Sequence, residues 1–144
     1  MLIAYQSALT WVLSFADYER NPAVKYSSAE FNLPRMEALL ARLANPHRAS
    51  PVIHIAGTKG KGSTAALVAS ALSKAGYRVG LYTSPHLHTF RERMRIGRRL
   101  ITEEEVAALV ARLRPEAETL NAQGTLGQVT TFELITALAF LFFE

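Results

Sequence analysis

Apolar positions recur at helical spacing in the first fifty residues, and they predict two helices there. Leu2–Tyr18 has the pattern of an amphipathic helix, and a polar connection over Asn21–Leu33 follows it. Pro34 suits the first turn of a second helix, which should end at the Asn45–His47 segment. The stripe that this second helix should bury consists of Met36, Leu39, Leu40 and Leu43.

Two further helices are predicted in the C-terminal part of the chain, by different signals. Thr102 precedes three glutamates, so its hydroxyl can cap a helix, and Glu105 can complete a capping box. This helix should run to about Leu113, and a separate piece beyond Pro115 stays open. Thr130–Phe143 is apolar nearly all round, which predicts a helix buried on every side.

The middle of the chain alternates between strand and helix patterns. Val52–Ala56 contains a short apolar run, as in a strand buried on both faces, and Arg78–Thr83 is a second strand candidate. A helix over Ala65–Ala75, stopped by Gly76, separates them. A strand, helix and strand in this order predict two parallel strands joined by a right-handed crossover.

A glycine-rich loop, Gly57–Ser63, joins the first strand to its helix. Its backbone N–H groups can converge on one point, where the helix dipole also favours a phosphate. Lys61 can reach the outer phosphates, and Ser63 or Thr64 can cap the helix. The predicted fold is therefore α/β, a P-loop-type parallel sheet with flanking helices, preceded by N-terminal helices.

The match to the common P-loop pattern is imperfect. That pattern has glycine where Ile55 stands, and serine or threonine where Gly62 stands. The alternative is a tight turn without a ligand. The charge of Lys61 argues against this alternative, because a turn alone has no use for it.

The segment Phe90–Ile96 alternates between apolar residues and arginines. In an extended strand, Arg91, Arg93 and Arg95 would share one face, either to bind an anion or to form a solvated edge. Glu92 falls on the apolar side, where a carboxylate needs a partner, and an arginine is the expected one.

Composition narrows the functional classes. The chain has 144 residues, which suggests one domain, and no cysteine, which excludes disulfides and thiolate metal sites. A net charge of +4 suits anionic small molecules and is too weak to indicate nucleic acid. No targeting segment stands out, and no apolar run approaches the roughly 20 residues of a membrane span.

The two predicted core strands are few for such a sheet, which commonly has about five or six. The apolar helix Thr130–Phe143 also lacks a later segment to cover it. We therefore expect the chain to be the N-terminal piece of a longer protein.

Three motifs give the chain a family resemblance. They are the loop Gly57–Ser63, the segment Thr83–Leu87 with the arginines after it, and Phe132-Glu133 at the start of an apolar helix. Together they resemble the N-terminal part of folylpolyglutamate synthase, including the bifunctional dihydrofolate synthase form, within the Mur ligase superfamily. Lys59 stands where many members have asparagine. The resemblance implies a helical lead-in over residues 1–50 and an incomplete central ATP-binding domain over 51–144, without the C-terminal glutamate ligase domain.

The family resemblance also implies an activity, an ATP- and Mg²⁺-dependent ligation of L-glutamate to a folate through an acyl phosphate. Whether dihydropteroate is also a substrate stays open. By resemblance, Lys61 is catalytic, and Ser84 and Glu133 are ligands of one magnesium ion, close enough together to share it. The implied ATP-binding residues are Gly57, Thr58, Lys59, Gly60, Lys61, Gly62, Ser63 and Thr64. The implied substrate residues are Asn32, Leu33, Pro34, Arg35, His86 and Arg91, where His86 could equally be structural.

The expected enzyme is cytoplasmic, is monomeric at full length, and binds neither nucleic acid nor membrane. The fragment alone should not turn over. The alternatives are a Mur-type ligase of cell-wall synthesis, a P-loop kinase or switch GTPase, and a non-catalytic module that binds ATP.

Overall fold

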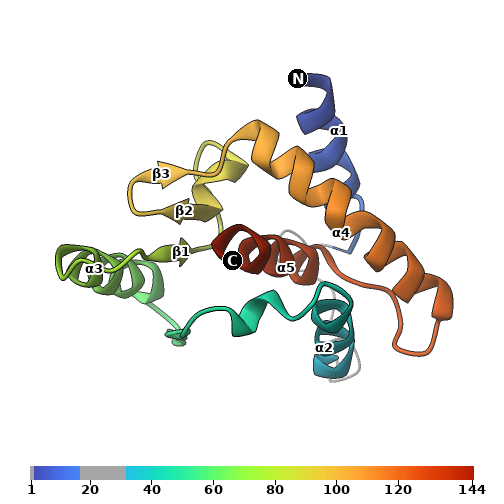
Figure 1. Ribbon diagram of the computed structural model, residues 1–144, viewed down its shortest axis with the longest axis horizontal. Coiled ribbons are helices and arrows are strands. Elements are labelled where there is room, and N and C mark those ends of the chain that lie inside the picture. The colour runs from blue at the N-terminus through green and yellow to red at the C-terminus, as the bar shows by residue number, and fades with distance from the viewer. Residues whose placement is uncertain (1, 17–31) are drawn as a thin grey trace.

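The computed structural model describes residues 2–16 and 32–144, and it is mostly helical in these ranges (Figure 1). The connection expected over Asn21–Leu33 lies largely outside them, and the first helix ends at Leu13, before the expected Tyr18. The α-helices are α1 (Leu2–Leu13), α2 (Leu33–Arg42), α3 (Lys61–Lys74), α4 (Glu103–Gln123) and α5 (Thr131–Phe143). The 3-10 helices are η1 (Pro46–Arg48) and η2 (Phe90–Arg93), and the strands are β1 (Gly80–Tyr82), β2 (Met94–Ile96) and β3 (Arg99–Leu100).

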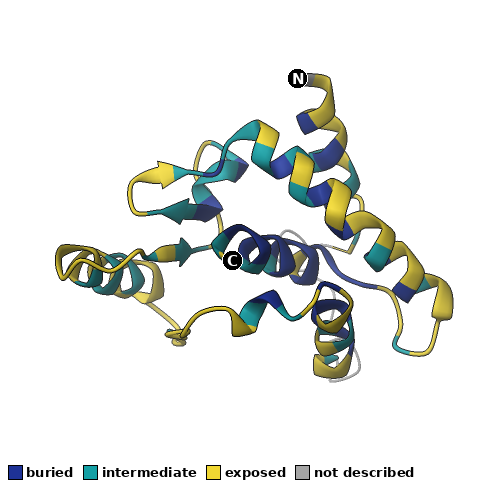
Figure 2. Cartoon of the chain, in the orientation of Figure 1, coloured by how far each residue is buried: buried dark blue, intermediate teal, exposed yellow. Residues whose placement is uncertain are grey.

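Helix α5 lies at the centre of the hydrophobic core. It contacts α1, α2, α4, η1 and β2, and its ribbon is buried along most of its length (Figure 2). This confirms the burial expected of a helix that is apolar nearly all round, although Phe132 is 46% exposed. The core therefore joins the N-terminal helices to the C-terminal ones.

Helices α2, α4 and α5 agree with their sequence patterns. Of the predicted stripe on α2, Leu39, Leu40 and Leu43 are buried and Met36 is partly buried. Helix α4 continues through Pro115 without a break, so no separate second piece forms. An unbroken buried stripe explains this continuity, since burial offsets the backbone hydrogen bond that proline removes. The stripe consists of Val106, Val110, Leu113, Ala117 and Leu120.

The sheet differs from the expected one. Strands β1, β2 and β3 are consecutive and antiparallel, with Leu81 opposite Arg95 and Ile96 opposite Arg99. The prediction of a parallel P-loop sheet is wrong for the described residues, because β2 returns directly alongside β1. Val52–Ala56 forms no strand there, and Val52 and Ile53 are each 62% exposed.

The segment Phe90–Ile96 is also not one extended strand. It begins as η2 and becomes β2 only at Met94. Thr89 caps η2 in a capping box with Glu92, and this local arrangement overrides the alternation of the sequence. No described helix is both long and apolar enough to cross a bilayer.

We predict that Gly80→Ala destabilises the protein by about 1–3 kcal/mol, because a Cβ at this position would clash with the partly buried ring of Phe143. That Cβ would lie 2.5–2.8 Å from ring atoms of Phe143 at the end of α5. Thermal unfolding measures the effect. Gly62→Ala is the control, since a Cβ there meets nothing within 4 Å.

The contact with Phe143 can be tested by a second substitution. If the ring causes the loss, Phe143→Ala combined with Gly80→Ala should cost less than the sum of the single changes. Additive losses would place the cause elsewhere in β1.

Candidate functional site

The glycine-rich loop leads directly into the N-terminus of α3. Gly60 is the N-cap, in the left-handed region at φ 76°, and no side chain caps the helix. The helix starts at Lys61, earlier than expected, so Ser63 and Thr64 lie within its first turn and do not cap it. The first intrahelical bond runs from the Thr64 N–H to the Gly60 carbonyl, at 2.9 Å. The preceding N–H groups of the first turn are thus available to an anion.

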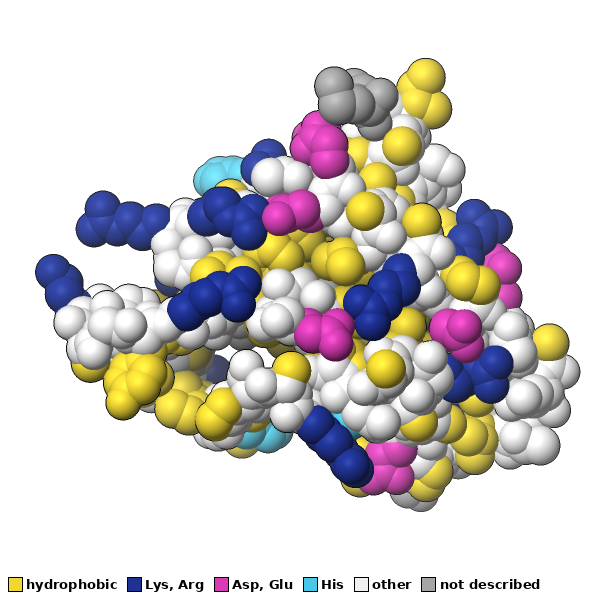
Figure 3. All heavy atoms as spheres, viewed as in Figure 1, with side chains coloured by type: hydrophobic (Ala, Val, Ile, Leu, Met, Phe, Trp, Pro, Cys, Tyr) yellow, Lys and Arg dark blue, Asp and Glu magenta, His cyan; other side chains and the backbone are white. Residues whose placement is uncertain are grey.

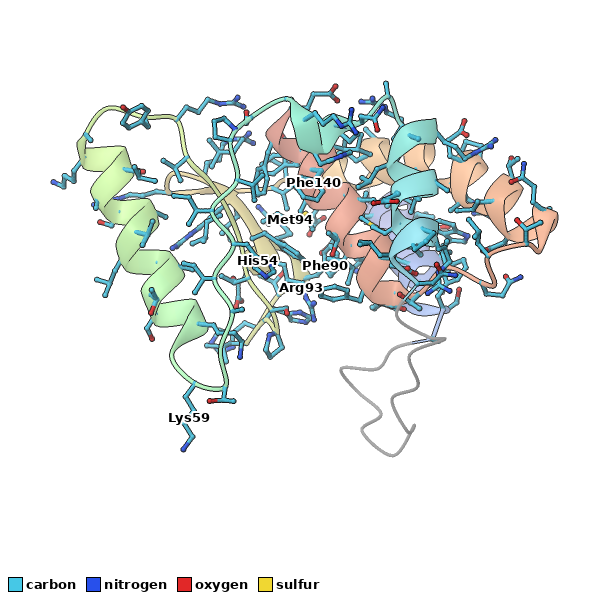
Figure 4. The ribbon with its side chains drawn as sticks, turned by 90° about the horizontal axis from the view of Figure 1, so that it is seen from below. His54, Lys59, Phe90, Arg93, Met94 and Phe140 are labelled. Atoms are coloured by element: carbon cyan, nitrogen blue, oxygen red, sulfur yellow. The ribbon has the colours of Figure 1, made fainter. Side chains whose placement is uncertain are left out.

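The two lysines of the loop point in different directions. The Lys61 ammonium folds back and donates to the carbonyl of Gly57 at 2.6 Å, so it closes over the loop. Lys59 lies at the tip of the loop, with its side chain directed away from the rest of the molecule (Figure 4). Residues 56–64 are all exposed. The loop therefore combines open N–H donors with one cation held across it, which suits a phosphate group.

The segment after β1 contains the other motif expected near the loop. Ser84 is exposed directly after the strand. His86 accepts a hydrogen bond at Nδ1 from Arg93 Nε, at 2.9 Å, and its ring meets the Phe90 ring edge-on. These contacts give His86 a structural role. The neighbouring Leu87 is an exposed apolar side chain, at 86%.

Glu92 holds this segment in a tight turn. Its carboxylate accepts the backbone N–H groups of Leu87, His88 and Thr89 at 2.8–3.0 Å. The hydrogen bond from Leu87 is the largest cause that lowers the pKa of Glu92, followed by the one from Thr89. The expected arginine partner is therefore wrong: backbone donors satisfy this carboxylate.

We predict that Glu92→Gln loosens the turn, because an amide offers one acceptor oxygen where the carboxylate offers two. Hydrogen exchange of the Leu87, His88 and Thr89 amides should accelerate severalfold. Glu104→Gln, an exposed change of the same kind on α4, is the control.

The wild-type protein should lose the same protection in acid. Because the pKa of Glu92 is lowered by folding, its stabilising effect is present above the unfolded pKa and disappears as the pH falls through the folded one. Protection of these amides that is unchanged in both experiments would contradict the capping role.

The three arginines expected on one face serve separate functions. Arg91 Nε donates to the carbonyl of Ile101 at 2.6 Å, and the buried Arg93 donates to His86. Arg95, on β2, faces α3. The expectation of a shared arginine face is therefore wrong, because η2 breaks the period of two.

A buried ion pair connects α2 to α5. Arg35 Nε donates to both carboxylate oxygens of Glu133, at 3.0 and 2.9 Å. Glu133 also accepts from the N–H and hydroxyl of Thr130, which completes the capping box of α5. Arg35 and Asn32 both donate to the carbonyl of Leu126 in the loop before α5, at 3.2 and 3.1 Å. One network thus fixes the start of α2 against the start of α5.

These contacts bear on the magnesium site expected from the resemblance. In this arrangement Oε1 of Glu133 accepts from Arg35, and Oε2 accepts from Arg35 and Thr130, so metal binding would compete with these contacts, and the metal role of Glu133 stays a prediction. No group of three or more histidine or acidic side chains could hold a metal ion within residues 2–16 and 32–144. Ser84 is exposed directly after β1, and its metal role stays a prediction.

The ion pair also divides the segment expected to line a substrate pocket. Arg35 is 4% exposed and faces Glu133, whereas Leu33 is 67% exposed and Pro34 is exposed. Asn32 uses its side chain to cap α2 through the Arg35 N–H and to hold the carbonyl of Leu126. Leu33 and Pro34 are therefore the members of this segment that are open to a ligand.

We predict that Arg35→Met destabilises the protein by about 3–5 kcal/mol, because it leaves the Glu133 carboxylate buried without its partner. Denaturant unfolding measures the loss. The matched control is Arg42→Met, which removes the half-buried pair with Glu116 and should cost about 1 kcal/mol or less. Equal losses of unfolding free energy would show that the buried pair contributes no more to stability than the pair of Arg42 with Glu116.

A left-handed glycine before an uncapped helix, with a lysine folded over the loop, defines a candidate phosphate-binding protein. Comparison with protein-family models finds no match. The dihydrofolate synthase/folylpolyglutamate synthase of Bacillus subtilis is 42% identical over 143 residues, which is 99% of this chain and 31% of the relative. The folylpolyglutamate synthase of Lacticaseibacillus casei is 41% identical over 76% of this chain and 26% of its own length.

Solved structures agree with these relatives. The crystal structure of folylpolyglutamate synthase from Thermotoga maritima matches 98% of this chain and 30% of its own, with a TM-score of 0.83 and 38% identity. A complex of the synthase with AMPPCP and folate matches 96% of this chain and 32% of its own, with a TM-score of 0.81 and 35% identity. The chain is thus a homologue of the folylpolyglutamate synthase/dihydrofolate synthase ligases, and it spans about 31% of the length of such a relative.

Proposed function

We propose that the protein carrying this chain is an ATP-dependent ligase that joins L-glutamate to a folate. The observation that carries the proposal is the open helix start at Gly60–Ser63 with Lys61 across it. It is supported by the homology, and by the related synthase crystallised with folate and an ATP analogue. Because the chain spans about a third of such relatives, the activity is proposed for the whole protein. The proposal includes a helical lead-in over 1–50, an ATP-binding part over 51–144, a cytoplasmic location and a monomeric full-length enzyme.

The chemistry needs positioning and charge neutralisation rather than a nucleophile from the protein. The substrate carboxylate attacks the γ-phosphorus of ATP, the bond to the β–γ bridging oxygen breaks, and ADP leaves. The amine of L-glutamate then attacks the acyl phosphate, loses a proton and displaces inorganic phosphate, which leaves an amide. In the proposal, the first-turn N–H groups of α3 hold the phosphates. Lys61 exchanges its hydrogen bond to Gly57 for contacts with the β- and γ-phosphates.

The remaining proposed site residues have different roles. Magnesium, when bound, would neutralise phosphate charge, and Ser84 and Glu133 are the proposed ligands from this chain. Leu33 and Pro34 are proposed to contact the folate, and Asn32 and Arg35 to position them. His86 and Arg91 are proposed to border the substrate, with His86 Nδ1 accepting from Arg93 and Arg91 Nε donating to the carbonyl of Ile101.

We predict that Lys61→Ala lowers ligation by about 100-fold or more, because it removes charge stabilisation of the transferring phosphoryl group. Incorporation of labelled L-glutamate into tetrahydrofolate, and separately into dihydropteroate, measures the activity and distinguishes the two substrates. Circular dichroism should show an unchanged fold. Arg48→Ala, an exposed change that also removes one positive charge, is the control. Near-normal turnover in the Lys61 variant would contradict the proposal.

A further inference from the structure

A cleft of about 340 Å³ separates α3 from the sheet. Apart from Lys74 at the end of the helix, the α3 residues that line this cleft have short side chains: Ala66, Ala69, Ser70 and Ser73. On the opposite side, Val79 and Leu81 form an apolar floor. Larger residues on α3 would fill this space, so the small ones keep it open.

Three cations line the cleft, and they come from three different segments. Lys74 comes from the end of α3, Arg95 from β2, and Arg98 from the turn between β2 and β3. None of these three side chains forms a hydrogen bond or ion pair with the described residues. Figure 3 shows basic side chains on this end of the molecule, over α3 and the β2–β3 hairpin, with acidic ones further away.

Arg95 differs from the other arginines of its segment. Its Cα lies opposite that of Leu81, so both side chains lie on the face of the sheet toward α3. Arg91 and Arg93 each donate to an acceptor within the fold, whereas Arg95, a half-buried residue, has no acceptor among the described residues. A partly desolvated charge without a partner is unfavourable, and an anion in the cleft would relieve this cost.

We propose that this cleft binds a small polyanion, a molecule with two or more carboxylate or phosphate groups. Its charged groups would contact Lys74, Arg95 and Arg98, with the hydroxyls of Ser70 and Ser73 as further donors. A short methylene body would lie on Val79 and Leu81. The volume is at the lower end of the range for small-molecule sites.

The cleft is distinct from the glycine-rich loop. Ala66 and Lys74 follow Lys61 by five and thirteen residues on α3, so the cleft spans about 7–20 Å along the helix from the loop. A ligand here would therefore occupy a second site, whether or not the loop binds ATP.

The test titrates the isotope-labelled protein with two probes, γ-linked triglutamate and inorganic tripolyphosphate. Binding at the cleft should shift the amide signals of Ser70, Ser73 and Gly97 and the Arg95 Nε signal. Arg95→Gln should weaken this binding about tenfold, since it removes a charge-assisted hydrogen bond. Arg48→Gln, which removes the same charge away from the cleft, should not.

Two further variants keep the test decisive. Arg98→Gln is exposed and should fold normally, and it should also weaken binding if the cleft is the site. Lys61→Gln should leave the cleft shifts unchanged, which separates them from binding at the loop.

The two probes identify the anion, because the one that binds more tightly shows whether carboxylate or phosphate is preferred. Shifts confined to the loop, or equal effects of Arg95→Gln and Arg48→Gln, would overturn the proposal.

Discussion

The buried carboxylate of Glu133 is the interaction on which the helical core depends. It closes the capping box of its own helix through Thr130 and pairs with Arg35 at the start of α2. Beside it, Thr131 donates its hydroxyl to the carbonyls of Val12 and Phe15 and so closes the end of α1. The buried ion pair fixes α2 to α5, and the neighbouring Thr131 contacts add the end of α1, so the ends of three helices meet at one point.

This anchor also sets the position of the sheet, through the helix that it starts. Helix α5 places Phe143 against Gly80, and the Tyr82 hydroxyl lies 3.3 Å from that of Thr136, so both ends of β1 contact α5. The strand leads to Ser84 and the turn held by Glu92. The position of Ser84 and of this turn therefore depends on the network that fixes the start of α5.

Local signals were sufficient to predict part of this structure. Thr102 and Glu105 lie within one turn, so their capping box is recognisable from the sequence alone. The partner of Glu133 is not, because Arg35 lies 98 residues away and no periodicity connects them. Val52–Ala56 has the composition of a buried strand, but composition does not identify a neighbouring strand, and the parallel sheet predicted from it is not observed. The loop could be predicted as an anion site because its glycines and lysine are adjacent, whereas the cleft beside Arg95 depends on tertiary packing.

The distribution of satisfied and unsatisfied groups separates the two parts of the described chain. In the helical core, the carboxylate of Glu133 and the guanidinium of Arg35 have partners, and the ends of α1, α2 and α5 are capped. Around α3, the helix start lacks a side-chain cap, Arg95 lacks an acceptor, and Val52 and Ile53 are exposed. Unpaired donors and exposed apolar surface are costly to keep, so they are expected where a ligand or another polypeptide supplies the missing contacts. The helical core thus contains the satisfied groups, whereas the proposed phosphate loop and the proposed anion cleft lie in the segment from Val52 to Arg98.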